Sequence, residues 1–245
     1  MSRSHVLLTA VVVAVALGVT GFLAYDLVLR GDAAAPLALP SASAGAAASS
    51  GPAASAGPAT SFDGVVAGTW KVTTGSQAGY RVRERLANLP AESDAIGRTD
   101  KVSGTITLAT SGSTTSLAAG TITVDTTSLA SDKAQRDNRL RREGLETDRF
   151  PTATFKLTRP VQVPAAALAG TTSDVTLTGD LTLHGVTKSV SIPAKARLVN
   201  GTVQVAGSIG FALSDYAMTA PNVGGFIVSI ADQGALEFVA VFTRG

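Results

Sequence analysis

Apolar and polar residues alternate with a period of two through much of this chain. From residue 175 to 183 every second position is apolar or Gly, and the positions between them are polar. The same alternation recurs in four further stretches, at 105–108, 121–125, 203–213 and 236–242. Alternation of this kind, with its enrichment in Thr and Val, predicts β-strands that bury one face.

The segments between these strands carry turn and helix signals. Asn200-Gly201 separates two alternating runs and predicts a two-residue type I′ hairpin. Residues 132–145 are highly charged and lack β-branched side chains, so they predict a short helix with Asp132 as its N-terminal cap. A final hairpin is expected around 232–234. About eight strands with one or two short helices predict an antiparallel barrel, because closure removes the exposed edge strands.

An uncharged run near the N-terminus stands apart from this pattern. Val6 to Tyr25 form an apolar stretch of 20 residues, which as a helix would span roughly 30 Å, the thickness of a bilayer core. A cleavable signal has a shorter apolar region, so residues 1–30 predict a signal-anchor with the rest of the chain outside the cytoplasm. The alternative is secretion after cleavage, with Ala33–Ala35 as the small residues at the cut.

Composition divides the remainder into two parts. Residues 31–65 are nearly all Ala, Ser, Gly and Pro, a composition that predicts a disordered linker because it offers few large apolar side chains to bury. Residues 66–245 are long enough for one domain with a substantial core. We therefore expect an anchor, a linker and a β-barrel domain in that order.

Few residues of the folded domain are suited to catalysis or metal binding. The chain has no Cys, which excludes disulfides and thiolate metal sites. Of its two His residues, His5 precedes the apolar run and His184 stands alone in the domain. We expect His184 to tie a strand end to the following turn, the alternatives being contact with a ligand headgroup or membership of a Ser-His-Asp arrangement. The formal net charge of +2 does not indicate nucleic-acid binding, and we expect no cofactor, no metal and no enzymatic activity.

Several motifs resemble those of the YceI-like family. The runs RDNRL at 136–140 and FPTATF at 150–155 are similar to one family signature, and GDLTLHGVTKSV at 179–190 closely resembles a second. Trp70 stands where the family begins with Trp. The resemblance covers residues 68–243 and implies a lipocalin-like antiparallel barrel with a long apolar interior pocket and no catalytic role.

The resemblance also implies a ligand and a place for it. A polyisoprenoid or quinone held in the barrel interior, for transport, storage or sensing, is the expected function of a membrane-tethered protein outside the cytoplasm. The candidate ligand-binding residues are His184, Tyr216, Met218, Phe155, Leu181, Leu183 and Phe211. The alternative is an envelope structural or interaction module, with a homodimer among its possible assemblies and a barrel filled by its own side chains. An interior cavity above about 300 Å³ would favour ligand binding, and a packed interior would favour the module.

Overall fold

The computed structural model describes residues 34–40, 65–86, 92–220 and 227–245. Residues 36–245 form one compact unit with its own core, separate from residues 1–35. Among the described residues, no helix combines the length and apolar character needed to cross a bilayer. The apolar run from Val6 to Tyr25 and most of the predicted linker lie outside the described residues, so the anchor remains a prediction.

Eleven strands of the described chain form one antiparallel sheet. Their bounds are β1 Gly68–Val72, β2 Gln77–Leu86, β3 Glu92–Thr99, β4 Val102–Ser111, β5 Thr114–Asp125, β6 Thr152–Leu157, β7 Val161–Gln162, β8 Ser173–Leu183, β9 Val186–Val199, β10 Thr202–Ala212 and β11 Ile227–Arg244. The helical segments are a 3-10 turn at Thr126–Ser128, α2 at Ala134–Arg139, a π-helical turn at Leu140–Gly144, α3 at Ala165–Leu168 and a 3-10 turn at Ser214–Tyr216.

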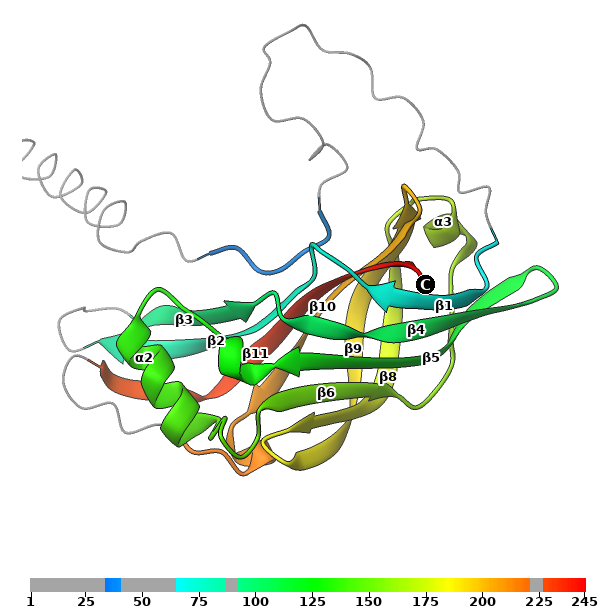
Figure 1. Ribbon diagram of the computed structural model, residues 1–245. Helices are drawn as coiled ribbons and strands as arrows, with labels where there is room; N and C mark the ends of the chain where they lie inside the picture. Colours follow the sequence, from blue (N-terminus) through cyan, green and yellow to red (C-terminus); the bar gives the residue numbers. More distant parts are fainter. Residues whose placement is uncertain (1–33, 41–64, 87–91, 221–226) are drawn as a thin grey trace, which may run out of the picture. The chain divides into compact units, whose positions relative to one another are not determined.

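The sheet closes into a barrel of eight strands. The order β1-β4-β5-β6-β8-β9-β10-β11 returns to its start because β1 pairs with β11, from Trp70 opposite Arg244 to Val72 opposite Phe242. The β2–β3 hairpin extends the sheet from the other part of β11, and it lies beside α2 at the end of the barrel away from α3 (Figure 1). The predicted antiparallel barrel with short helices is confirmed.

The last strand differs from its prediction. Residues 227–244 form a single strand, so the hairpin expected around 232–234 is wrong. The pairing of β11 with β2 shifts register between Ile230 and Gly234, while its pairing with β10 continues through Gln233 opposite Ala212. A β-bulge on one side therefore accommodates the polar residues that resemble a turn in the sequence.

The predicted hairpin turn is confirmed and the predicted helix cap is wrong. Asn200 and Gly201 have φ values of 50° and 69°, as a type I′ turn requires. Helix α2 begins after Lys133, and no side chain caps its first turn. The Asp132 carboxylate binds the Arg136 guanidinium instead, because residues four apart on a helix face each other and a charged partner competes with the backbone N–H groups.

The alternating apolar positions of β8 lie on one buried face, as predicted, and the structure shows that this face lines the barrel interior. Four positions of β8 share this face, and all four are buried: Leu177, Gly179, Leu181 and Leu183. Gly179 is one of these positions, and a Cβ atom there would lie only 2.5 Å from Cζ of Phe155. The absent side chain of Gly179 thus makes room for the Phe155 ring of β6, the strand paired with β8.

The described part of the predicted linker forms hydrogen bonds with β9 and β11. The backbone N–H of Leu37 donates to Oε2 of Glu237 on β11 at 3.2 Å, and Arg197 on β9 donates to the carbonyl oxygen of Pro40. The Glu237 side chain is buried and also accepts from Nη2 of Arg98 at 2.9 Å. Residues 36–40 are therefore held against the folded domain by backbone hydrogen bonds.

Candidate ligand-binding cavity

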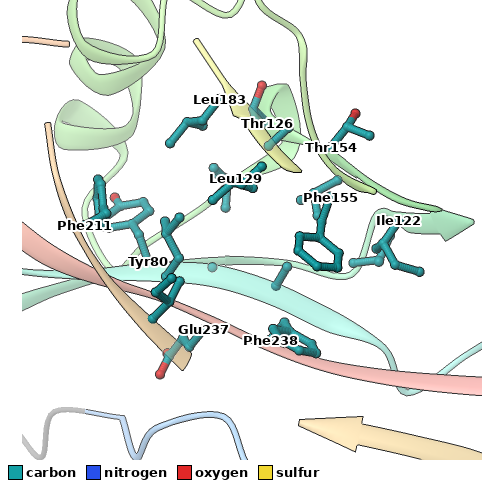
Figure 2. Close-up of a pocket in the computed structure, with 18 of the residues that line it drawn as sticks. Tyr80, Ile122, Thr126, Leu129, Thr154, Phe155, Leu183, Phe211, Glu237 and Phe238 are labelled. Carbon is teal, nitrogen blue, oxygen red and sulfur yellow. The ribbon is translucent and has the colours of Figure 1, made fainter. Parts of the chain in front are cut away.

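A cavity of about 230 Å³ lies inside the barrel (Figure 2). Its lining is almost entirely carbon and comes from all around the barrel, including β2, β4, β5, β6, β8, β10 and β11. The volume is below the 300 Å³ that we set for a ligand cavity, but the interior is not packed by its own side chains. Volume alone therefore does not decide between the two expected functions.

The lining residues extend over much of the barrel's length. On β8 they run from Leu177 to Leu183, and on β11 from Leu236 to Phe242, each stretch spanning about 20 Å at 3.3 Å per residue. In Figure 2, Tyr80 and Phe211 lie toward one end of the cavity, and Phe238 lies toward the other. An eight-stranded barrel is just wide enough for a slender guest. The shape suits a chain-like apolar molecule, whose burial would contribute about 25 cal/mol per Å² of apolar surface.

Five of the seven candidate ligand-binding residues line the cavity. These are Met218, Phe155, Leu181, Leu183 and Phe211. His184 and Tyr216 do not line it. Tyr216 is buried in the core beside Met218, and its backbone carbonyl lies 3.1 Å from Nδ1 of His184. The role of these five lining residues in ligand binding remains a prediction.

His184 connects two turns at one end of the barrel. It follows β8 with φ at 49°, in the left-handed region, and its ring lies 4.4 Å from the Phe150 ring. Its Nδ1 atom meets the Tyr216 carbonyl after β10, and its Nε2 atom lies 3.6 Å from Oε1 of Glu146. These contacts agree with the expected role of tying a strand end to neighbouring loops.

Sequence reasoning missed the polar residues at the α2 end of the cavity. Tyr80 and Arg136 both contribute to the lining. Burial raises the pKa of the Tyr80 hydroxyl to about 12, with Arg136 opposing the shift. The period-two pattern of β2, in which Ala78, Tyr80, Val82 and Glu84 share one buried face, is a signal that could have found Tyr80.

Arg136 is held in place by three side chains. Its Nη1 atom donates to Oε1 of Glu84 at 2.7 Å, its Nε atom to Oγ of Ser131 at 3.3 Å, and its Nη2 atom to Asp132. Burial would lower the pKa of the guanidinium, but the charge and hydrogen bond of Glu84 raise it above its usual value. Asp137 accepts from the hydroxyl of Ser131 at 2.5 Å. Arg136 of the family-like signature thus braces α2 against β2, and Asp137 ties α2 to the preceding loop.

A closed antiparallel barrel around a long apolar cavity is a lipocalin-like architecture. The YceI-like domain matches residues 70–242, and the chain belongs to the YceI-like family. The resemblance seen in the sequence motifs is confirmed.

Individual relatives match shorter stretches. A UPF0312 protein of Vibrio parahaemolyticus serotype O3:K6 is 44% identical over 75 residues, which are 30% of this chain and 36% of that protein. Protein YceI of Escherichia coli O17:K52:H18 is 40% identical over 75 residues, 30% of this chain and 35% of that protein. The match thus spans about a third of the length of these curated relatives.

A solved structure shares the fold over a longer stretch. It is described as a polyisoprenoid binding domain from Saccharophagus degradans implicated in plant cell wall breakdown, and it aligns with a TM-score of 0.54 and 21% identity. The alignment covers 73% of this chain and 99% of the other. At this identity the likeness concerns the fold.

Proposed function

We propose that this protein is a non-enzymatic lipid-binding barrel that holds one long apolar chain of the polyisoprenoid type in its interior. The observation that carries the proposal is the continuous carbon-lined cavity inside a closed barrel. Membership of the YceI-like family supports it, as does the fold shared with a structure described as a polyisoprenoid binding domain. Transport, storage or sensing of the lipid would each use this binding.

The test is native mass spectrometry on residues 36–245, which form a compact unit, purified without detergent and mixed with geranylgeraniol. A one-to-one complex is expected. Ala240→Phe, which adds a ring to a buried cavity-lining position, should abolish the complex. Ala109→Phe makes the same change at an exposed position of β4 and should leave the complex intact. Failure of the unaltered protein to bind any isoprenoid, or equal binding by the Ala240→Phe variant, would refute the proposal.

We further propose that the barrel is tethered to the outer side of the cytoplasmic membrane by residues 1–30. The uncharged run from Val6 to Tyr25 supports this location. Membrane fractionation of the full chain after alkaline washing, with intact-mass analysis of its N-terminus, tests it. A chain retained in the membrane with residues 1–30 present is expected. A soluble chain shortened near Ala33–Ala35 would instead indicate secretion after cleavage.

A further inference from the structure

The α2 end of the cavity gathers several buried polar atoms. Tyr80 and Arg136 line the cavity, whereas Glu84 and Ser93 do not line it. Glu84 lies on the same buried face of β2 as Tyr80, two positions beyond Val82. Ser93 of β3 stands directly opposite Glu84 in the strand register. Because paired residues of adjacent strands have Cβ atoms about 5 Å apart, the Glu84 and Ser93 side chains are neighbours. We name these four residues, Tyr80, Glu84, Ser93 and Arg136, the polar end.

Two buried oxygen atoms of the polar end have no hydrogen-bond partner. Oε2 of Glu84 and Oγ of Ser93 are inaccessible to solvent, and neither bonds to any residue that the structure describes. The other carboxylate oxygen of Glu84 is satisfied by Arg136 at 2.7 Å. A buried polar group without a partner costs about 1–3 kcal/mol, so a ligand headgroup that passed between the lining residues and bonded to these two oxygen atoms would recover that cost.

The donors and acceptors of the polar end limit which headgroups fit. The Glu84 carboxylate only accepts hydrogen bonds, so it requires an O–H or N–H donor. The Tyr80 hydroxyl forms no hydrogen bond within the described chain and can donate to a headgroup oxygen. A headgroup that both donates and accepts would therefore satisfy the site, whereas a quinone carbonyl, which only accepts, would leave Glu84 unpaired.

The charges of the polar end disfavour an anionic headgroup. The Arg136 guanidinium is already paired with Glu84 and Asp132, and Asp137 adds a third carboxylate that acts on Tyr80. Glu84 and Asp137 are buried, and these two carboxylates against one guanidinium would repel a phosphate brought into this low-dielectric end of the barrel.

We propose that the polar end is a headgroup subsite that selects an uncharged headgroup bearing a hydrogen-bond donor, so that the ligand is a long-chain alcohol of the isoprenoid type rather than its phosphate or a quinone. This inference rests on the proposed binding function. In this subsite the Tyr80 hydroxyl donates a hydrogen bond to the headgroup, the Glu84 carboxylate accepts one from it, and the Ser93 hydroxyl can do either.

Three ligands with one common chain test the inference. Residues 36–245 are mixed with equal amounts of geranylgeraniol, its methyl ether and geranylgeranyl phosphate, and the bound fractions are read by native mass spectrometry. The ether keeps an acceptor oxygen but lacks the donor. Because the ether loses a hydrogen bond to a charged acceptor, the alcohol is expected to bind with about tenfold or more higher affinity than the ether. The phosphate is expected to bind still more weakly.

Two conservative variants and a control test whether the preference for the alcohol arises at the polar end. Tyr80→Phe and Ser93→Ala each remove one hydroxyl and should reduce alcohol binding by about threefold to tenfold, with near-UV circular dichroism unchanged. Thr154→Val alters another polar residue of the lining, outside the polar end, and should leave the preference intact. Equal effects of all three variants would overturn the assignment to this end.

The outcomes separate this inference from the binding function. Equal binding of alcohol and ether, or preference for the phosphate, would overturn the subsite while leaving isoprenoid binding in place. Binding of none of the three ligands would refute the binding function itself. A crystal structure of the alcohol complex in which an ordered water still bridges Glu84 and Ser93 would also overturn the subsite, because that water would satisfy both oxygen atoms.

Discussion

Removing the Arg136 side chain is expected to destabilise the barrel strongly. The Arg136 and Glu84 side chains are 6% and 2% exposed and are joined at 2.7 Å. Arg136→Met leaves the Glu84 carboxylate buried without a counter-charge, a change that typically costs about 3–5 kcal/mol. Since small domains are stable by about 5–15 kcal/mol, this loss is a large share of the total.

Urea unfolding followed by circular dichroism measures the effect. With a slope of about 2 kcal/mol per M, a loss of about 4 kcal/mol lowers the unfolding midpoint by roughly 2 M. The double variant Glu84→Met/Arg136→Met removes both charges and should lie within about 1 kcal/mol of the unaltered protein, because apolar replacement of a buried ion pair is often neutral or stabilising.

An exposed arginine provides the matched control. Arg83 pairs with Asp94 at 3.3 Å, but its side chain is 64% exposed, so Arg83→Met should cost less than about 1 kcal/mol. The reasoning is refuted if Arg136→Met costs as little as this control, or if the double variant is as unstable as Arg136→Met alone.

Three further outcomes follow from local geometry. The pKa of Tyr80 is raised to about 12, so the Tyr80 hydroxyl loses its proton at a lower pH in the unfolded chain than in the folded one. About 2–3 kcal/mol of stability should therefore disappear between pH 10 and 12. Urea unfolding across this pH range measures the loss, and Tyr80→Phe should abolish it. Gly97→Ala places a Cβ atom 2.3 Å from the Tyr80 ring and should cost at least about 1–3 kcal/mol, with the Tyr80 titration shifted toward its ordinary value; an unchanged midpoint in urea would contradict this. The hydrogen bond from Lys188 lowers the pKa of the Asp215 carboxyl. The stabilisation from this pair is therefore present above the pKa that Asp215 has in the unfolded chain, and it is lost as the pH falls through the lowered pKa of the folded protein. Lys188→Met should return the Asp215 titration, followed by NMR, to its ordinary range.

The alternation of buried and exposed positions could be predicted from the sequence because a period of two has a direct geometric meaning, but the face that lines the barrel interior could not. Leu236, Phe238, Ala240 and Phe242 alternate with Glu237 and its neighbours, and all four belong to the hydrophobic core or pack against it. The hairpin at Asn200 was likewise predictable, since the residues that adopt positive φ there are few. Local chemistry was sufficient in both cases.

The shape of the site could not be predicted in the same way. The Phe155 ring fills the space beside Gly179 from another strand, so small residues in the sequence do not mark empty volume. His184 belongs to a recognisable motif, yet its ring is oriented by the carbonyl of Tyr216, 32 residues away in the chain. The charged stretch at 132–145 predicted a short helix, but the burial of Arg136 and Asp137 depends on partners that come from β2 and a preceding loop.

Strand β11 has a consequence for how the barrel reaches its folded state. It pairs with β10 along most of its length and with β2 and then β1 on its other edge, and its contact with β1 joins residues about 170 positions apart, a separation that predicts slow folding. Until β11 has paired on both sides, the edges of β10 and β1 are open to other chains. Aggregation during folding should therefore compete with closure, and conditions that protect these two edges should raise the yield of the native barrel more than conditions that stabilise the finished fold.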